Sequence, residues 1–149
     1  MAVRLTKDAF SGDASACVPL KKTNFKILVM GDSSVGKTSL LRQYMTKAYD
    51  TTLRSTIGVD YMRKDLVVDN VLVTLQLWDT AGQERFKSLT PAFYRAADAC
   101  LIVFDVTNVQ SFNNLEGWLH DFEQNCGEGR TCAVLGNKTD LADARVVPQ

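Results

Sequence analysis

One eight-residue stretch limits what this chain can fold into more than any other feature. Residues 31–38 read Gly-Asp-Ser-Ser-Val-Gly-Lys-Thr, which is the pattern G-x-x-x-x-G-K-[ST]. The apolar run Phe25–Met30 precedes it and predicts a short buried strand, and Ser39–Met45 follows it and predicts a helix. A strand, a glycine-rich loop and a helix in this order form a phosphate-binding unit.

The chemistry of this loop is suited to the phosphates of a nucleotide. Glycines allow the backbone N–H groups to converge on phosphate oxygens, and the start of the helix adds about half a positive charge. Lys37 supplies a full charge, and the Thr38 hydroxyl can bind the Mg²⁺ that accompanies a di- or triphosphate. The residues expected to bind phosphate are Gly31, Asp32, Ser33, Ser34, Val35, Gly36, Lys37, Thr38 and Ser39.

Composition excludes several other classes of protein. Lys plus Arg equals Asp plus Glu at 17 each, which gives no reason to expect nucleic acid or a membrane surface as partner. The four cysteines lack metal-ligand spacing, and Cys100 and Cys132 are predicted to be small core residues of a reduced, cytoplasmic protein. Since no apolar run approaches about 18 residues, we expect no membrane span.

The chain is long enough for one domain preceded by an arm. Residues 1–24 have no hydrophobic period and are predicted to be a flexible N-terminal arm, and residues 25–149 are predicted to form the domain. Two β-like runs, Val59–Val68 and Val71–Trp78, are joined by Asp69-Asn70, a two-residue hairpin turn.

Further along, strands alternate with helices. Cys100–Phe104 and Cys132–Leu135 are continuous apolar runs, typical of parallel strands covered on both faces. Between them, a helix with one core-facing stripe is predicted from the spacing of Leu115, Trp118, Leu119 and Phe122, with His120 on the solvated side. The fold class is therefore α/β, a doubly wound, mostly parallel sheet with one antiparallel strand and helices on both faces.

A second motif concerns the base of the nucleotide. The segment 137–140 reads Asn-Lys-Thr-Asp, and the Asp140 carboxylate can accept the two hydrogen bonds that guanine offers side by side and adenine does not. In this reading the phosphate loop, Asp79 and Asn137 each follow a strand directly. Because ligands bind at the carboxyl ends of parallel strands, we expect all three at one edge of the sheet.

Together these motifs resemble the Ras superfamily of small GTPases, with a P-loop NTPase fold, over residues 25–149. The resemblance implies that GTP or GDP binds with Mg²⁺, held by Thr38, Thr56 and Asp79, and that Asn137, Lys138 and Asp140 recognise guanine. By the same resemblance Tyr49 packs against the base and Gly82 contacts the γ-phosphate. The catalytic residues would be Gln83, which orients the attacking water, and Lys37.

Within the superfamily the likeness is to Rab proteins, more specifically those of the late endosome. Five segments carry it, namely residues 57–61, 75–78, 85–89, 93–97 and 102–107, and Tyr61, Trp78 and Phe93 match the aromatic triad that Rab effectors contact. The resemblance implies a slowly hydrolysing GTP switch for vesicle traffic. Its partners would be exchange factors, activating proteins and effectors, and it would act at the cytosolic face of vesicle or endosomal membranes.

The family continues past residue 149 with a further strand, a helix and a prenylated tail, so the chain is expected to be a C-terminally truncated GTPase domain whose membrane anchor is absent. An alternative is a nucleotide-bound interaction module that does not cycle and whose GTP binding is impaired. A kinase or ATPase with a phosphate loop is a third reading, against which the residues 137–140 and 79–84 argue.

Overall fold

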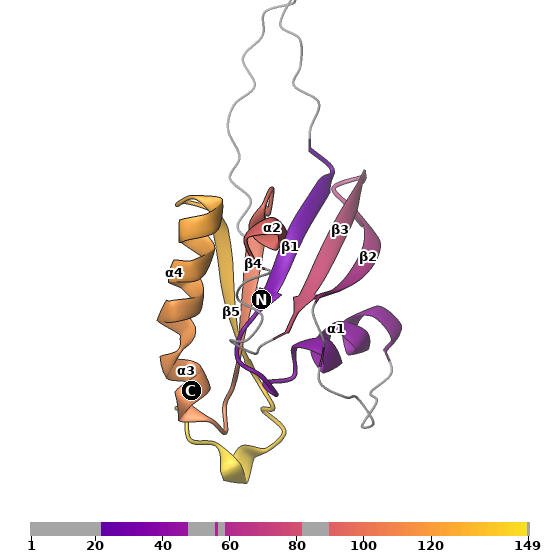
Figure 1. Ribbon diagram of the computed structural model, residues 1–149. Helices are drawn as coiled ribbons and strands as arrows, with labels where there is room; N and C mark the ends of the chain where they lie inside the picture. The colour runs from indigo at the N-terminus through magenta and orange to yellow at the C-terminus, as the bar shows by residue number, and fades with distance from the viewer. Residues whose placement is uncertain (1–21, 48–55, 57–58, 82–89, 149) are drawn as a thin grey trace, which may run out of the picture.

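The computed structural model of the chain describes residues 22–47, 56, 59–81 and 90–148. Its five strands form one sheet in the order β2-β3-β1-β4-β5 (Figure 1). The strands are β1 (Asn24–Met30), β2 (Val59–Val68), β3 (Val71–Thr80), β4 (Ala99–Asp105) and β5 (Thr131–Asn137). All neighbouring strands are parallel except β2 and β3, which are antiparallel, and this confirms the predicted α/β sheet.

Helices cover both faces of the sheet. They are α1 (Lys37–Thr46), α2 (Thr90–Tyr94), α3 (Val109–Asn113) and α4 (Leu115–Cys126), and a 3₁₀ turn follows at Ala142–Ala144. The sequence predicted α1 and α4 but neither α2 nor α3, because a helix of five residues is too short to show a hydrophobic period. None of the helices described has the length and apolarity needed to cross a bilayer.

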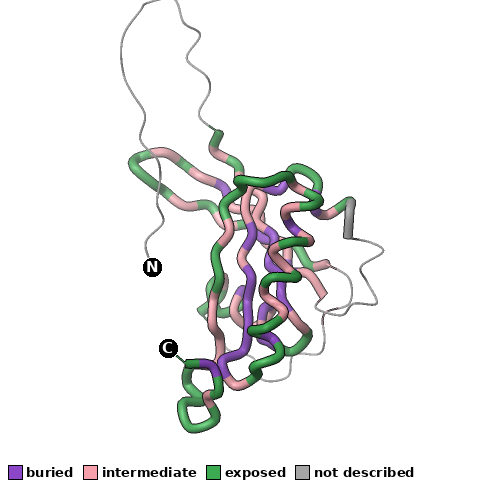
Figure 2. The backbone as a smooth tube through the Cα atoms, turned by 90° about the vertical axis from the view of Figure 1, so that its left-hand side faces the viewer, coloured by how far each residue is buried: buried purple, intermediate pink, exposed green. Residues whose placement is uncertain are grey.

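Adjacent residues of β1 separate the two halves of the core. Leu28 points to the face of the sheet where it packs with Ile102 of β4 and Phe122 of α4. Val29 points to the opposite face, where it packs with Val103 of β4 and Leu41 of α1. Helices α1 and α4 therefore lie on opposite faces. The buried part of the chain is concentrated in the central strands (Figure 2).

The β2–β3 hairpin has the predicted turn. Asp69 and Asn70 both adopt left-handed conformations, with φ of 49° and 61°. Positive φ at both central residues is the mark of a type I′ turn, whose twist matches that of the strands it joins. The strand Val59–Val68 is found with the predicted bounds.

Two predicted strand ends were wrong. We expected Asn137 directly after a strand, but it is the last residue of β5 and pairs with Asp105 of β4. We also expected Asp79 directly after a strand, but β3 continues to Thr80, which pairs with Val59 across the hairpin. Asp79 is hence inside the sheet, paired with both Val29 of β1 and Asp60 of β2. Because β3 still pairs with β1 and β2 at Asp79, the polar residues after Trp78 do not end the strand.

Candidate functional site

The phosphate loop leaves β1 at Gly31 and enters α1 at Lys37. Gly31 has a φ of +134°, and a Cβ at this position would lie 2.1 Å from the carbonyl oxygen of Val103. Gly36 has a φ of +93°, and a Cβ there would lie 2.4 Å from Asn137 Nδ2. Both glycines of the motif are thus required by positive φ and by close approach to the ends of β4 and β5.

Lys37 is buried inside this loop. Its Nζ donates hydrogen bonds to the carbonyl oxygens of Gly31, at 2.8 Å, and Asp32, at 2.7 Å, and the residue is 6 % exposed. Burial lowers the pKa of Lys37 to about 8, and the nearby carboxylates of Asp79 and Asp32 oppose this shift. Within the described part of the chain the loop uses two of the three ammonium N–H donors, which leaves the third for an anion.

Three oxygen-bearing side chains meet next to Lys37. Thr38 Oγ1 lies 2.7 Å from Thr56 Oγ1 and donates a hydrogen bond to Asp79 Oδ2. Asp79 is completely buried, and among the described residues its Oδ1 has no hydrogen-bond partner. Burial raises the pKa of Asp79, and the hydrogen bond from Thr38 and the charge of Lys37 oppose the rise.

This oxygen set fits Mg²⁺. Hydroxyl groups with one carboxylate, completed by substrate phosphates and water, are the ligands that Mg²⁺ takes in nucleotide sites. The unpartnered Asp79 Oδ1 is a buried acceptor that lacks a donor or cation. No cluster of three or more His, Cys, Asp or Glu that could hold a metal occurs in the part of the chain that the structure describes, so a cage made of protein ligands alone is not present there.

The second motif lies against the first. Asn137 Nδ2 donates a 2.8 Å hydrogen bond to the carbonyl oxygen of Val35, which is 102 positions away in the sequence. Lys138 has a left-handed backbone, with a φ of 62°, and its Nζ lies 2.6 Å from Asp105 Oδ2. Asp140 is exposed. The structure therefore brings the predicted phosphate and base segments to the same edge of the sheet.

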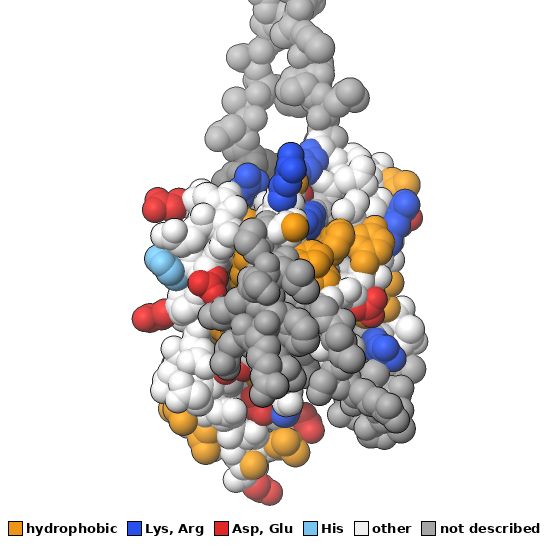
Figure 3. All heavy atoms as spheres, viewed as in Figure 1, with side chains coloured by type: hydrophobic (Ala, Val, Ile, Leu, Met, Phe, Trp, Pro, Cys, Tyr) orange, Lys and Arg blue, Asp and Glu red, His pale blue; other side chains and the backbone are white. Residues whose placement is uncertain are grey.

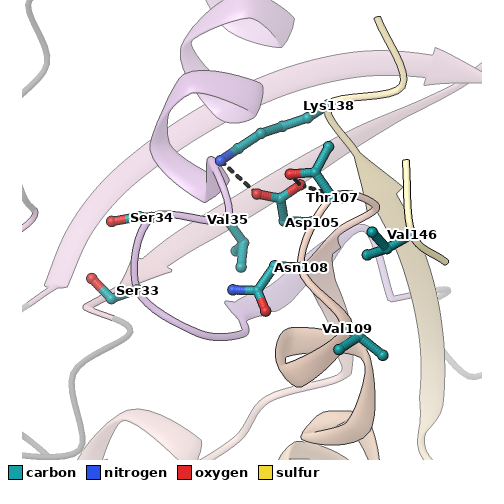
Figure 4. A pocket seen from close by; sticks show the side chains of 9 residues that line it. All are labelled: Ser33, Ser34, Val35, Asp105, Thr107, Asn108, Val109, Lys138 and Val146. Atoms are coloured by element: carbon teal, nitrogen blue, oxygen red, sulfur yellow. Dashed lines mark hydrogen bonds and ion pairs between the residues drawn. The ribbon is translucent and has the colours of Figure 1, made fainter. Parts of the chain in front are cut away.

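A cavity of about 570 Å³ opens between these segments (Figure 4). Its volume is in the range of small-molecule sites. In the figure the Lys138 side chain extends to Asp105, next to the side chain of Thr107. The cavity is lined by Ser33, Ser34, Val35, Asp105, Thr107, Asn108, Val109, Lys138 and Val146.

The sequence analysis did not predict Asp105 as part of the site. Asp105 accepts hydrogen bonds from the backbone N–H and hydroxyl of Thr107, at 2.8 and 2.7 Å. Burial acts to raise the pKa of Asp105, but the hydrogen bonds from Lys138 and Thr107 outweigh it and lower the pKa. Asp105 ends β4 at the edge where the predicted residues lie, so the rule for parallel strands could have found it.

The sequence also missed how Asp32 is held. Its carboxylate accepts hydrogen bonds from Asn114 Nδ2 and Trp118 Nε1, both at 2.8 Å, and this connects the phosphate loop to α4. Trp118 packs against the core as predicted, but core packing is only part of its role. No sequence pattern indicates this bond, because its partners are 86 positions apart.

Of the four remaining predicted site residues, one lies within the described part of the chain. Ser39 lies in the first turn of α1 and is half-buried. Tyr49, Gly82 and Gln83 lie outside the described residues. The expected roles of these four residues stay predictions.

The three aromatic residues predicted to meet partners form a row. The rings of Tyr61 and Trp78 are 5.2 Å apart, those of Trp78 and Phe93 are 6.2 Å apart, and Tyr61 is 46 % exposed. Lys26 Nζ lies 4.6 Å from the Trp78 ring, in a cation–π contact. In the view of Figure 3, hydrophobic side chains lie beside Lys and Arg side chains in the upper part of the molecule.

Comparison with known proteins agrees with this arrangement. The model of the Ras family matches residues 26–149. The chain is 48 % identical over 133 residues to Ras-related protein Rab-7b of Paramecium octaurelia, covering 87 % of this chain and 65 % of that protein. It is 47 % identical to Ras-related protein Rab-7a of Dictyostelium discoideum, covering 87 % and 66 %, and 48 % identical to Ras-related protein Rab7 of Drosophila melanogaster, covering 85 % and 63 %. The chain thus spans slightly less than two thirds of the length of these relatives. It belongs to the Ras family, and within that family it is similar to Rab7 proteins.

Proposed function

We propose that this chain binds GTP and GDP together with Mg²⁺ and hydrolyses GTP slowly, as a switch in membrane traffic. The observation that carries the proposal is the hydrogen bond from Asn137 Nδ2 to the carbonyl oxygen of Val35. This bond joins a phosphate-binding loop to a segment that can read a purine. A single ligand can therefore contact both segments at once.

The phosphate end of the ligand would bind to the loop. Lys37 is held by two backbone carbonyls, and its third N–H would donate to a phosphate oxygen. The first N–H groups of α1 have no partner within the helix, and their partial positive charge favours the same anion. Trp118 of α4 holds the loop through Asp32, and Asn137 of β5 holds it through the Val35 carbonyl, so the loop is preorganised for the ligand.

The Mg²⁺ ion would be held by Thr38, Thr56 and Asp79. When bound, the ion supplies positive charge to the phosphate oxygens. The ion would be a ligand for Asp79 Oδ1, which has no hydrogen-bond partner among the described residues.

The base end would be read by Asp140. Guanine presents two adjacent N–H donors to a carboxylate. Adenine would leave the Asp140 carboxylate unpaired, at a cost of about 1–3 kcal/mol where the bound base shields it from water. Lys138 is directed by Asp105, which fixes the segment that carries Asp140.

Hydrolysis would follow from positioning rather than covalent catalysis. Gln83 would orient the attacking water, and Lys37 would stabilise charge on the phosphates. Ras alone turns over at about 10⁻⁴ s⁻¹, and an arginine supplied by an activating protein adds roughly 10³–10⁵-fold. We expect the same slow timing here, with the segments about 49–60 and 79–93 changing order when the γ-phosphate is lost.

The partners would be proteins that read this change. The row Tyr61, Trp78 and Phe93 adjoins the segments expected to switch, and the similarity to Rab7 proteins favours exchange factors, activating proteins and effectors of traffic at the cytosolic face of endosomal membranes. Aromatic side chains at an exposed surface are the usual anchors of such interfaces.

The decisive experiment is a nucleotide-binding titration of the purified chain with Mg²⁺ and GDP, GTP or ATP. We expect GDP and GTP to bind and ATP not to bind. Lys37→Ala should abolish binding, and Arg42→Ala, which removes a positive charge from the exposed face of the same helix, should leave it unchanged. Equal affinity for ATP and GTP, or no nucleotide binding at all, would refute the proposal.

Two further measurements separate base reading from turnover. Asp140→Ala should weaken GTP binding at least tenfold, and Asp143→Ala, an exposed carboxylate three residues further on, should not. Chromatography of the bound nucleotide after incubation with GTP then tests hydrolysis. GTP that persists for many hours, even with an activating protein, would indicate the non-cycling interaction module instead.

A further inference from the structure

Two cysteines on neighbouring strands lie in contact beneath α4. Cys100 of β4 and Cys132 of β5 are direct partners in the parallel register, so their side chains point to the same face of the sheet. The Cys100 thiol donates to the Cys132 sulfur, and the two Sγ atoms are 3.1 Å apart. Cys100 is buried, with 2 % of its surface exposed, and Cys132 is half-buried.

The spacing of the two strands suits a disulfide. Neighbouring strands are about 4.8 Å apart, which is inside the range of about 4.4–6.8 Å that disulfides require between Cα atoms. The sulfur atoms need to approach by only about 1 Å to reach bonding distance. The movement that bond formation requires is therefore small.

A third thiol nearby is engaged differently. Cys126, at the end of α4, donates to the carbonyl oxygen of Tyr94 at 3.2 Å. It packs against the same part of the core as Cys132. Cys126 thus shares the environment of the pair without the sulfur–sulfur contact, which makes it a suitable internal control.

We propose that Cys100 and Cys132 form a reversible disulfide when the chain meets a hydroperoxide oxidant. Cys132, as the more exposed of the two, reacts first: its thiolate attacks a peroxide oxygen, the O–O bond breaks, and a sulfenic acid forms with release of water after protonation. The Cys100 sulfur then attacks the sulfenic sulfur, the S–O bond breaks, and a second water leaves with the thiol proton. For hydrogen peroxide, two thiols are oxidised, one peroxide is reduced, and two waters form.

Burial explains this order of events. Removal from water raises the pKa of the Cys100 thiol, and the adjacent Cys132 sulfur raises it further. A neutral, buried thiol reacts slowly with an oxidant in solution. It can still attack a sulfenic sulfur that already lies in contact with it.

The disulfide would close a loop across 32 positions that contains α3 and α4. It would join β5, the outermost strand at this side of the described sheet, to the buried strand β4. These strands end at Asp105 and Asn137, which are paired in register. Oxidation would therefore tie together the two strands that position Asp105 and the segment 137–140.

The test is treatment of the reduced, purified chain with hydrogen peroxide, followed by alkylation of the remaining thiols and mass spectrometry. We expect a product that lacks two hydrogen atoms, a Cys100–Cys132 cross-linked peptide under non-reducing conditions, and reversal by dithiothreitol. Because a loop of this length is closed, the oxidised chain should unfold about 5–10 °C higher than the reduced chain.

Variants identify the pair. Cys126→Ser and Cys17→Ser, each in the full chain, should form the same cross-link, and Cys132→Ser should not. Should Cys132→Ser fold poorly, peptide mapping of the wild-type chain decides alone. A cross-link through Cys126 or Cys17, or oxidation that stops at separate sulfenic or sulfinic acids, would overturn the proposal.

Discussion

The indole N–H groups of the two tryptophans of the chain have different surroundings, and mutation can test the consequence. Trp118 Nε1 donates to Asp32 Oδ1 at 2.8 Å, whereas Trp78 Nε1 is buried and has no hydrogen-bond partner among the described residues. Both indoles are half-buried and pack against the core. Replacing each with Phe removes an N–H and a similar volume, and in Trp78→Phe it also weakens the cation–π contact with Lys26.

The expected difference follows from these contacts. A hydrogen bond to a charged acceptor contributes about 1.5–3 kcal/mol, so Trp118→Phe should lose this amount in addition to the loss of packing. Trp78→Phe removes a buried N–H that is not satisfied, which relieves a penalty of about 1–3 kcal/mol. Weakening of the Lys26 contact costs Trp78→Phe up to about 1 kcal/mol. We therefore expect Trp118→Phe to lower the free energy of unfolding by at least about 1 kcal/mol more than Trp78→Phe does.

Urea denaturation followed by circular dichroism measures both variants without relying on the tryptophan that was removed. The slopes of the two transitions should agree, since the surface exposed on unfolding is nearly the same. Asn114 still donates to Asp32 Oδ2 in Trp118→Phe, so the phosphate loop should keep one of its two bonds to α4. Equal destabilisation of the two variants, or greater loss in Trp78→Phe, would refute the reasoning.

Three other predictions concern the loop and its neighbours. The pKa of Lys37 in the folded chain is about 8, below its ordinary value of 10.5, so between these pH values the unfolded chain binds more protons than the folded one. In the ligand-free chain the free energy of unfolding should therefore rise by up to about 3 kcal/mol from pH 8 to pH 10.5, relative to Lys37→Met. Urea denaturation measures both pH profiles, and parallel profiles would contradict this prediction. Gly31→Ala should lower the free energy of unfolding by at least about 3 kcal/mol, because the new Cβ would overlap the Val103 carbonyl. Gly117→Ala in α4 has open space around the new Cβ and should leave the free energy of unfolding unchanged or raise it by up to about 1 kcal/mol. Equal denaturation midpoints for the two variants would contradict this prediction. GDP should raise the Tm of the wild-type chain more in the presence of Mg²⁺ than in its absence. Asp79→Asn should fold but lose this additional rise in Tm. If Mg²⁺ has the same effect on the Tm of the variant, Asp79 does not hold the ion.

The sequence by itself determined the local elements of this protein. Each depends on residues that are neighbours in the chain: the glycines of the phosphate loop, the Asp69-Asn70 turn and the apolar runs that became β4 and β5. Steric limits on φ and the period of hydrophobic residues act over a few positions, so they can be read directly. The prediction that the two motifs lie at one edge of the sheet also followed, because parallel strands bring their carboxyl ends together.

Only the tertiary structure decided which side chains meet within that site. The bonds from Trp118 to Asp32, from Lys138 to Asp105 and from Thr38 to Asp79 connect different elements of the fold. Whether such bonds form depends on the strand order and on which helix covers which face of the sheet. A hydrogen bond needs its two atoms within about 3 Å, and hydrophobic periodicity does not position atoms from distant parts of the chain so closely. For that reason the residue types of the site were predictable, and their partners were not.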